Sequence, residues 1–280
     1  MESPAEILPG IIFYSYLSSQ RKEKSCVWNH HTLVMQVSGQ MRLETSEQNI
    51  VISAGEVLLV HKNQLGTLTK TPESGGYYET VVISLQEDLM RKITLEEKLE
   101  ADGKYTGPLN LCLPNNDFLK GYFQSILPYA RSSGVEMTDE MGLLKVKEGI
   151  KLMLLAVPPL RNFLFDFSEP YKIDLERFML SNYHFNVPVE KFAQLTGRSL
   201  SGFKRDFQKA FGMPTRKWLQ DKRLNEARHL IENKNKKPSS IYLELGFETL
   251  SHFSNAYKKK FGRAPTVVAS APIKKRNVVK

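Results

Sequence analysis

The sequence predicts a two-domain α+β protein, with an antiparallel β domain and its flanking helices at the N-terminus and an all-helical domain at the C-terminus. Its 280 residues suffice for two domains that each bury a core. Short strand patterns separated by turns fill the chain to about residue 85, whereas the patterns after residue 171 are helical. The charge changes at the same place: Lys and Arg number 16 against 21 Asp and Glu up to Tyr171, and 23 against 9 beyond it.

The C-terminal segment thus has a charge balance of +14 and the preceding segment one of −5, within a chain of net charge +9. This asymmetry indicates that the C-terminal segment binds a polyanion, either a nucleic acid or an anionic membrane surface. A hydrophobic share of 41% and a charged share of 25% are typical of a soluble globular protein.

The other bulk features favour the cytoplasm and a protein that does not enter a membrane. Cys26 and Cys112 lie far apart and form neither a CxxC motif nor a disulfide framework. The N-terminus lacks the basic start and apolar core of a signal peptide. Two prolines and two charged residues interrupt the most apolar stretch, residues 151–167, which excludes an ordinary membrane helix.

The β domain is predicted from six short strand patterns rich in Val, Ile, Thr and Tyr. Turn signals such as Ser38-Gly39 and Ala54-Gly55 separate them. Strands at such regular spacing predict an antiparallel sandwich or a small barrel, and the helices that a parallel sheet needs between its strands are not seen. The predicted strands are residues 32–37, 41–45, 49–52, 57–60, 66–71 and 77–84.

Helical patterns follow the strands. Residues 117–130 and 139–156 alternate apolar and polar faces, Pro158-Pro159 ends the second pattern, and another apolar segment covers residues 160–167. These helices either cover the β domain or pair with a second copy of the chain. The sequence leaves both possibilities open.

The predicted domain boundary is Glu169-Pro170-Tyr171, because the charge changes sign there and the patterns become helical. It divides the chain into domains 1–168 and 169–280. The second domain ends in a basic tail.

The second domain contains a helix-turn-helix pattern over about residues 187–212. Val189–Thr196 supplies a short helix, Gly197 the tight turn and Ser199 the N-cap of the next helix. Two phenylalanines at positions i and i+4 of that helix face the core. The outward face consists of hydrogen-bonding and cationic side chains that suit a DNA groove: Ser201, Lys204, Arg205 and Gln208.

The same pattern is repeated over about residues 238–262. Ser240–Leu245 supplies the short helix, Gly246 the turn and Thr249 the cap, and an aromatic pair at i and i+4 again faces the core. Between the two copies, Pro214–Asn233 predicts one long helix that packs against both units. The outward face of the repeat consists of Ser251, Ser254, Asn255 and Lys258.

Two such units, 50 residues apart from Ser201 to Ser251 in a basic segment, predict binding to duplex DNA. The segment Val187–Thr266 resembles the DNA-binding domain of AraC/XylS-type transcription regulators. The residues that carry the resemblance are Ala193, Leu195, Gly197, Ser199, Phe203, Arg205, Phe207, Phe211, Gly212, Gly246, Phe247, Ser251, His252, Phe253, Tyr257, Lys258 and Phe261 through Pro265.

The resemblance implies a sequence-specific DNA-binding transcription regulator, whose N-terminal domain controls it through a ligand, a partner protein or dimerisation. In that family the N-terminal half is often a cupin-like barrel with helices. Expected partners are double-stranded DNA, RNA polymerase, a second copy of the chain and a small-molecule or protein effector. Family members commonly carry Gln where Leu250 stands and Arg where Asn255 stands, so the second recognition helix is expected to read bases weakly.

Side-chain chemistry predicts which residues contact the DNA. A guanidinium reaches O6 and N7 of guanine as a fork, an ammonium reaches them as a point charge, and Asn suits adenine. The predicted base-reading residues are Ser201, Lys204, Arg205, Ser251, Ser254 and Asn255. The residues predicted to bind phosphates, which adds affinity and salt dependence, are Ser199, Lys209, Arg216, Lys217, Thr249, Lys258, Lys259 and Lys260.

The N-terminal domain offers a weaker chemical signal in His30-His31, Glu56 and His61. Adjacent strand residues point to opposite faces, so His30 and His31 cannot both enter one metal pocket. No phosphate loop, GxSxG motif or pair of carboxylates is seen, and neither a metal, a cofactor nor a catalytic residue is expected. Side chains that could line a ligand cavity are Tyr77, Tyr78 and Glu79.

Two other classes of protein remain open. A metal-dependent cupin-type enzyme with an appended DNA-binding domain predicts stoichiometric iron, zinc or manganese. A structural nucleoid protein or RNA-binding protein predicts little preference among duplex sequences, and a salt dependence as steep on random DNA as on its best site.

Overall fold

The computed structural model describes residues 5–18, 20–131, 136–167 and 172–265. The chain divides into two compact units, Met1–Glu169 and Pro170–Lys280, and each is described by itself. The predicted boundary at Glu169-Pro170-Tyr171 and the basic tail from Thr266 onward lie outside the described residues. Within those ranges, no helix is long and apolar enough to cross a membrane.

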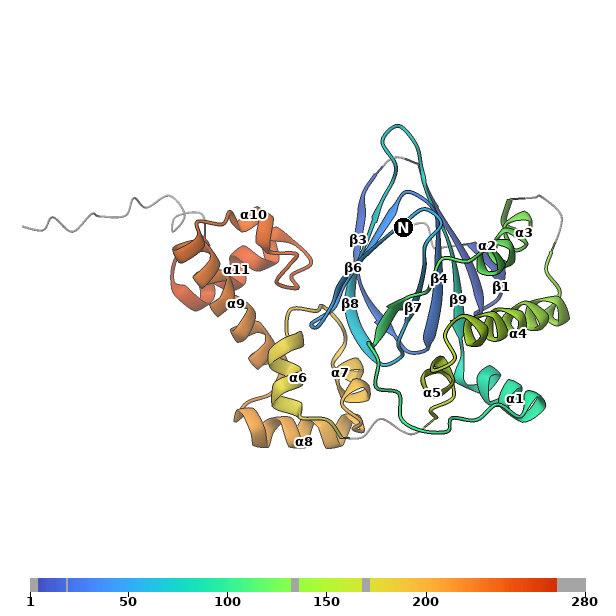
Figure 1. Ribbon diagram of the computed structural model, residues 1–280. Coiled ribbons are helices and arrows are strands. Elements are labelled where there is room, and N and C mark those ends of the chain that lie inside the picture. The colour runs from blue at the N-terminus through green and yellow to red at the C-terminus, as the bar shows by residue number, and fades with distance from the viewer. Residues whose placement is uncertain (1–4, 19, 132–135, 168–171, 266–280) are drawn as a thin grey trace, which may run out of the picture. The chain divides into compact units, whose positions relative to one another are not determined.

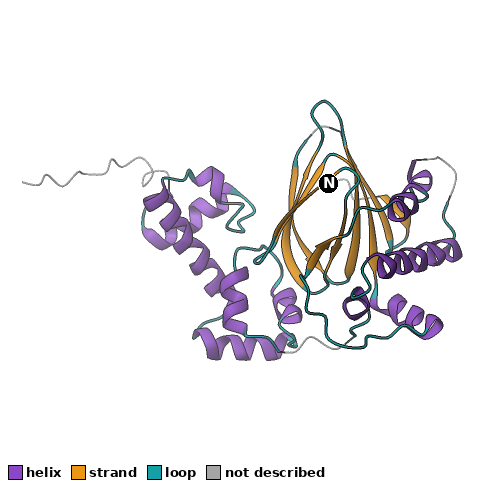
Figure 2. Cartoon of the chain, in the orientation of Figure 1, coloured by secondary structure: helices purple, strands orange, loops and turns teal. Residues whose placement is uncertain are grey.

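The strands described in the N-terminal unit form two sheets, and every pairing is antiparallel (Figure 2). The six-stranded sheet has the order β1 (Ala5–Leu8), β2 (Ile12–Leu17), β9 (Tyr78–Leu85), β4 (His31–Ser38), β7 (Val57–Val60) and β10 (Asn110–Cys112). The four-stranded sheet has the order β3 (Lys22–Trp28), β8 (Gln64–Thr71), β5 (Gln40–Glu44) and β6 (Asn49–Ser53).

Both faces of the six-stranded sheet are covered, which explains why β4 and β7 are apolar on both sides. Val34 of β4 belongs to a cluster with Met41 and Leu43 of the four-stranded sheet. Its neighbour Leu33 points the opposite way, as successive strand residues do, and belongs to the cluster that the helices complete. The unit therefore has three layers: helices, the six-stranded sheet and the four-stranded sheet (Figure 1).

The helix layer of this unit consists of α1 (Glu87–Glu97), α2 (Asp117–Gln124), α3 (Leu127–Arg131), α4 (Asp139–Ala156) and α5 (Leu160–Leu164). The Thr138 hydroxyl starts α4 by accepting a hydrogen bond from the N–H of Met141 (3.3 Å). Gly149 allows α4 to lie close to α2, because a Cβ at that position would stand 2.7 Å from the hydroxyl oxygen of Tyr122. These close contacts fix which face of α4 is buried.

The predicted strands and the helix over residues 139–156 are confirmed to within about two residues at each end. The single helix predicted over residues 117–130 is wrong, because the helix ends at Gln124 and a second one, α3, begins at Leu127. The helix α1 and the strands β1, β2, β3 and β10 were not among the predicted elements. A closed cupin-like barrel is not confirmed, because the pairings stop at β1 and β10 on one sheet and at β3 and β6 on the other.

The described part of the C-terminal unit is helical throughout: α6 (Leu175–Asn182), α7 (Val189–Leu195), α8 (Leu200–Phe211), α9 (Thr215–Lys234), α10 (Pro238–Ile241) and α11 (Leu250–Phe261). The long helix α9 is shared by two cores. Its Trp218 packs edge-on against Phe207 and at a tilt against Phe211 of the first helix-turn-helix unit. Further along, Leu224 and Ile231 pack with the buried aromatics of the second unit.

Candidate DNA-binding interface

The first candidate recognition helix, α8, presents a polar outer face above an aromatic core. The Ser199 hydroxyl accepts a hydrogen bond from the N–H of Gly202 (3.2 Å) and so caps the helix. Phe203 and Phe207 are fully buried, and the ring of Phe207 lies 5.6 Å from that of Trp218. The polar residues of the opposite face are all exposed: Ser201, Lys204, Arg205, Gln208 and Lys209.

The second candidate recognition helix, α11, is built in the same way. The Thr249 hydroxyl accepts a hydrogen bond from the N–H of His252 (3.1 Å), and Phe253 and Tyr257 are fully buried. Gly262 ends the helix in the left-handed conformation at φ 75°, as Gly212 ends α8 at φ 68°. On its outer face the exposed residues are Ser251, Asn255, Lys258 and Lys259, whereas Ser254 is only half-exposed.

Arg205 is a highly accessible cation of the α8 face, with 79% of its side chain exposed. Its Nε lies 3.6 Å from a carboxylate oxygen of Asp206. That carboxylate is also bound by the Nε of Arg198 (3.1 Å), and this hydrogen bond lowers the pKa of Asp206. The Asp206 carboxylate is thus shared by a mostly buried arginine, Arg198, and by Arg205, whose side chain stays largely exposed.

The predicted phosphate-binding residues fall into two groups. Lys209, Arg216, Lys217, Lys258 and Lys259 are exposed, and the hydroxyls of Ser199 and Thr249 stand at the exposed N-termini of α8 and α11. Lys260 differs, because its ammonium donates to the backbone oxygen (2.9 Å) and the carboxylate (2.8 Å) of Asp221 on α9. In the free protein Lys260 therefore joins α11 to α9.

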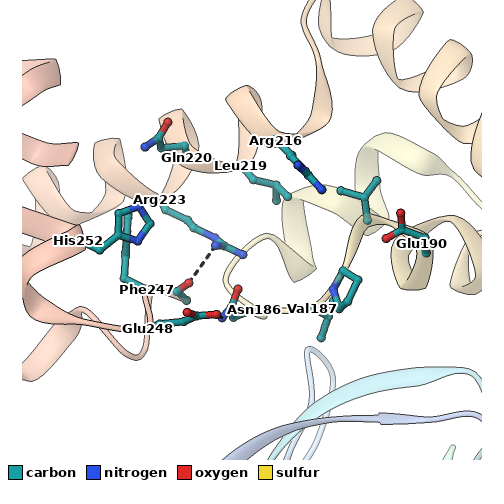
Figure 3. A pocket seen from close by; sticks show the side chains of 13 residues that line it. Asn186, Val187, Glu190, Arg216, Leu219, Gln220, Arg223, Phe247, Glu248 and His252 are labelled. Atoms are coloured by element: carbon teal, nitrogen blue, oxygen red, sulfur yellow. Dashed lines mark hydrogen bonds between the residues drawn. The ribbon is translucent and has the colours of Figure 1, made fainter. Parts of the chain in front are cut away.

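The surface between the two recognition helices is hollowed. One hollow of about 480 Å³ extends from Glu190 and Arg216 to His252 in the first turn of α11 (Figure 3). A second hollow of about 430 Å³ shares Glu190 and Arg216 and extends to Lys204 and Gln208 on the outer face of α8. Together they connect the two outer faces across the N-terminal turn of α9.

Sequence reasoning missed the most engaged side chain of the first hollow, Arg223 of α9. Figure 3 shows it with its hydrogen bond to the backbone of Gly246, the turn residue of the second unit. Two further hydrogen bonds run to the loop between α6 and α7. No spacing rule of the sequence indicates these partners, since the loop lies about 40 residues away along the chain.

Two of the histidines considered for metal binding, His31 and His61, pack in an aromatic cluster with Phe163. The ring of His31 is buried, 4.8 Å from that of His61 and 4.6 Å from that of Phe163, and burial holds its pKa well below the usual value. His30 lies outside this ring cluster and is half-exposed. The described residues contain no group of three or more His, Cys, Asp or Glu that could hold a metal ion.

Of the three residues proposed to line a ligand cavity, Tyr78 does so. It borders a cavity of about 70 Å³ between the two sheets, together with Lys70. Tyr77 is exposed, and Glu79 is buried in an ion pair with Arg131 (2.6 Å). Glu79 thus anchors α3 to the sheet.

Comparisons with known proteins find matches in both compact units of the chain. A family model described as a helix-turn-helix domain matches residues 192–271, and the ExsA N-terminal regulatory domain matches residues 31–158. A relative named HTH-type transcriptional regulator ExsA, from Pseudomonas aeruginosa, is 23% identical over 258 residues, which cover 86% of this chain and 90% of that protein. The chain belongs to the AraC/XylS-type transcription regulators. It is a DNA-binding regulator with an N-terminal regulatory domain.

Other relatives of this AraC/XylS-type regulator match about a third of the chain. The virulence regulon transcriptional activator VirF of Yersinia enterocolitica and the thermoregulatory protein LcrF of Yersinia pestis are each 33% identical over 92 residues, covering 33% of this chain and 34% of theirs. Among solved structures, ToxT from Vibrio cholerae aligns over 92% of this chain and 98% of its own, with a TM-score of 0.40 and 14% identity.

Proposed function

We propose that the protein reads two successive major grooves on one face of the duplex, about 10 base pairs apart, and that α8 makes most of the base discrimination. The observation that supports this is the inequality of the two outer faces. Lys204 and Arg205 on α8 occupy the positions that Ser254 and Asn255 occupy on α11. Cations that reach guanine discriminate among base pairs more strongly than a half-exposed hydroxyl does.

In this proposal Ser201, Lys204 and Arg205 read bases from α8, and Ser251, Ser254 and Asn255 do so more weakly from α11. The hollows between the helices would receive the sugar-phosphate backbone that separates the two grooves, with Arg216 at their shared border. Phosphates are also assigned to Lys217 in the first turn of α9 and to residues at the ends of the recognition helices: Ser199, Lys209, Thr249, Lys258 and Lys259.

Selection of binding sites from random duplexes, followed by footprinting, tests this proposal. The expected result is one strongly constrained element and one weakly constrained element, with protection of two groove segments about one helical turn apart. Protection of one groove segment alone would contradict the two-groove model. Equal salt dependence and equal affinity on selected and random DNA would instead indicate a nucleoid-type binder.

We also propose that residues 1–168 form the regulatory domain and 169–280 the DNA-binding domain, with the two sheets arranged in a cupin-like manner. The cavity beside Lys70 and Tyr78, of about 70 Å³, is small compared with the ~300–1,000 Å³ of typical ligand pockets. A small effector could bind there only if it is compact or if the sheets separate. Thermal shift of the whole protein with candidate carboxylates, compared between Lys70→Met and the unaltered chain, tests such binding.

We propose that the protein is a homodimer that associates through the outer face of α4. On this face Met141, Leu144, Glu148, Lys151 and Leu155 follow the 3,4 spacing of a helix-pairing seam. Leu144 and Leu155 are 65% and 70% exposed, although the helix is otherwise packed on the core. Large exposed apolar side chains in one stripe are typical of a protein interface.

The order of residues on this stripe is self-complementary in an antiparallel pair. With a two-fold axis between Glu148 and Lys151, each Leu144 lies against the Leu155 of the other copy. Each Glu148 then lies against the other copy's Lys151, so opposite charges meet at the centre. The chain thus offers on α4 a surface that fits a second copy of itself.

Sedimentation of the purified chain tests the α4 dimer. Leu144→Glu alone and Leu155→Lys alone should weaken the dimer, whereas the double variant should restore it because each Glu then faces a Lys. Leu95→Glu is the matched control, since Leu95 is 82% exposed on α1 and lies outside the stripe. A dimer that Leu144→Glu leaves intact, or a chain that is monomeric throughout, contradicts the proposal.

Finally, we propose that the protein acts in the cytoplasm as an activator that recruits RNA polymerase, without catalytic activity or a cofactor. Relatives from Yersinia enterocolitica, the VirF proteins, are named transcriptional activators, and this supports the assignment. Transcription in vitro, with purified polymerase and a template carrying the selected site, should rise on addition of the protein. A fall in transcription on every placement of the site would contradict activation.

A further inference from the structure

Arg223 lies where α9 passes from one helix-turn-helix unit to the other. Its Nε donates to the backbone oxygen of Tyr183 (2.8 Å), and its Nη2 donates to that of Phe185 (2.9 Å). Both acceptors belong to the loop that leads into the first unit. Its Nη1 donates to the backbone oxygen of Gly246 (3.0 Å), the turn of the second unit. One guanidinium therefore holds backbone groups of both units.

The two units touch at the same point through their backbones. Gly246 has φ +77°, and a Cβ there would collide with the backbone oxygen of His184. Beside this contact, the side-chain amide of Asn186 donates to Glu248 (3.2 Å). The turn of the second unit is thus seated directly on the loop that precedes the first.

The chemistry of Arg223 suits a clamp better than a DNA contact. Burial lowers the pKa of its guanidinium to about 10, and it remains charged at neutral pH. No ion pair joins it to a carboxylate among the residues that the structure describes. Its donors are directed at three carbonyl oxygens, and the planar fork of a guanidinium binds several fixed acceptors that a lysine ammonium cannot match.

We propose that Arg223 is a positioning residue that fixes the separation and orientation of α8 and α11, and thereby the number of base pairs between the two elements of the DNA site. The proposal rests on the two-groove function described above. Because each base pair adds a rise of about 3.4 Å along the duplex, a rigid protein tolerates one spacing and rejects its neighbours. A chain without the clamp would accept neighbouring spacings more equally.

The test measures affinity for a series of duplexes in which the two selected elements are one base pair closer, at the selected spacing, or one base pair further apart. The affinity of the unaltered chain should fall about tenfold or more for each base pair added or removed, because such a change costs about as much as one lost specific contact. Arg223→Met should reduce this spacing penalty to about threefold or less, with the penalty for mutating the first element unchanged. A general loss of stability would weaken binding to all duplexes alike and leave the ratios between spacings unaltered.

Arg228→Met is the matched control. It removes one guanidinium from the same helix, but among the residues that the structure describes Arg228 contacts Glu232 of α9 itself and Phe261 of the second unit, and neither belongs to the first unit. The Arg228→Met variant should therefore show the same loss of affinity per base-pair change in spacing as the unaltered chain. Gly246→Ala perturbs the same joint from the opposite side, because its Cβ would stand against the backbone oxygen of His184 and 2.9 Å from Cζ of Arg223, and it should also flatten or shift the preferred spacing.

The outcomes separate the clamp from the function on which it rests. If the unaltered chain shows no spacing preference, the two-groove function fails. If it shows one and Arg223→Met retains it in full, the clamp alone is overturned. Should Arg223→Met not fold, Arg223→Lys serves in its place, because it keeps the charge and most of the volume but loses the fork, and a retained penalty would equally overturn the proposal.

Discussion

The two helix-turn-helix units share one framework and differ in what they present to DNA. Each recognition helix has 12 residues, a hydroxyl cap, an aromatic pair at i and i+4, and a glycine in the left-handed conformation at its end. The residues that build this framework are buried or define the termini. The differing residues to which base reading is assigned, Lys204 and Arg205 against Ser254 and Asn255, lie on the outer faces. Folding thus constrains one side of each helix and leaves the other free for recognition.

The largest expected effect tests whether the two frameworks are equivalent. Phe203→Ala and Phe253→Ala each remove a fully buried ring, so each should lower the free energy of unfolding of the C-terminal unit by about 3–5 kcal/mol. Denaturant unfolding followed by circular dichroism measures both. A loss in one variant several times larger than in the other would show that the two frameworks are not equivalent.

The next effect tests whether the outer faces are unequal. Arg205→Ala should reduce the preference for the selected base over its competitors by about 1–3 kcal/mol. Asn255→Ala should cost less than about 1 kcal/mol of preference, because the second element is weakly constrained. Competition binding with single-base variants of both elements measures this difference. Equal losses from the two substitutions would refute the assignment of unequal readers.

The hydroxyl caps provide a smaller and symmetrical effect. Ser199→Ala and Thr249→Ala each remove a hydrogen bond to a helix N–H, and each should lower the free energy of unfolding by about 1 kcal/mol. If the hydroxyls also bind phosphates, DNA affinity falls by more than the fraction of unfolded protein explains. Unfolding curves and affinities of the same preparations distinguish these two results.

The smallest effects sharpen the distinction between lysines that bind DNA and lysines that hold the fold. Lys258→Gln and Lys259→Gln should each lower the slope of log affinity against log salt by about 1, with the base preference unchanged. Lys260→Gln should lower it less, because that ammonium is already bound to Asp221. A slope change as large for Lys260 as for its neighbours would show that DNA displaces the ion pair.

The features predicted from sequence are those with local signals. The strands from β4 to β9 consist of alternating or consecutive apolar residues bounded by turn residues. Both recognition helices begin after a hydroxyl N-cap and contain an aromatic pair at positions i and i+4. The helix α1 carries such a signal, which the prediction missed, in Glu87-Asp88 at its first turn and in Met90 and Ile93 on its buried face. The strand β3 carries a poor one, because its first residues, Lys22 to Lys24, are exposed and charged.

Features of the site that depend on distant partners could not be predicted. Arg223 stands among charged residues on a helix, a pattern typical of a solvated face, and only the fold brings three carbonyl oxygens to it. Lys260 ends a run of three lysines, and nothing in that run distinguishes it from the two exposed ones. The division of the strands into two sheets could not be predicted either, because it depends on which strands pair and not on the sequence of any one strand.

One helix serving two cores has a consequence for how the protein changes over generations. Since α9 contributes Trp218 to the first core and Leu224 to the second, neither unit is expected to persist folded without the other. Selection for folding of the first unit therefore also preserves the second unit, whatever the outer face of α11 recognises. Substitutions on the exposed side of α11 then meet little selection from folding. We expect the promoter element facing α11 to diverge among related regulators faster than the element facing α8, and new target genes to be acquired through it.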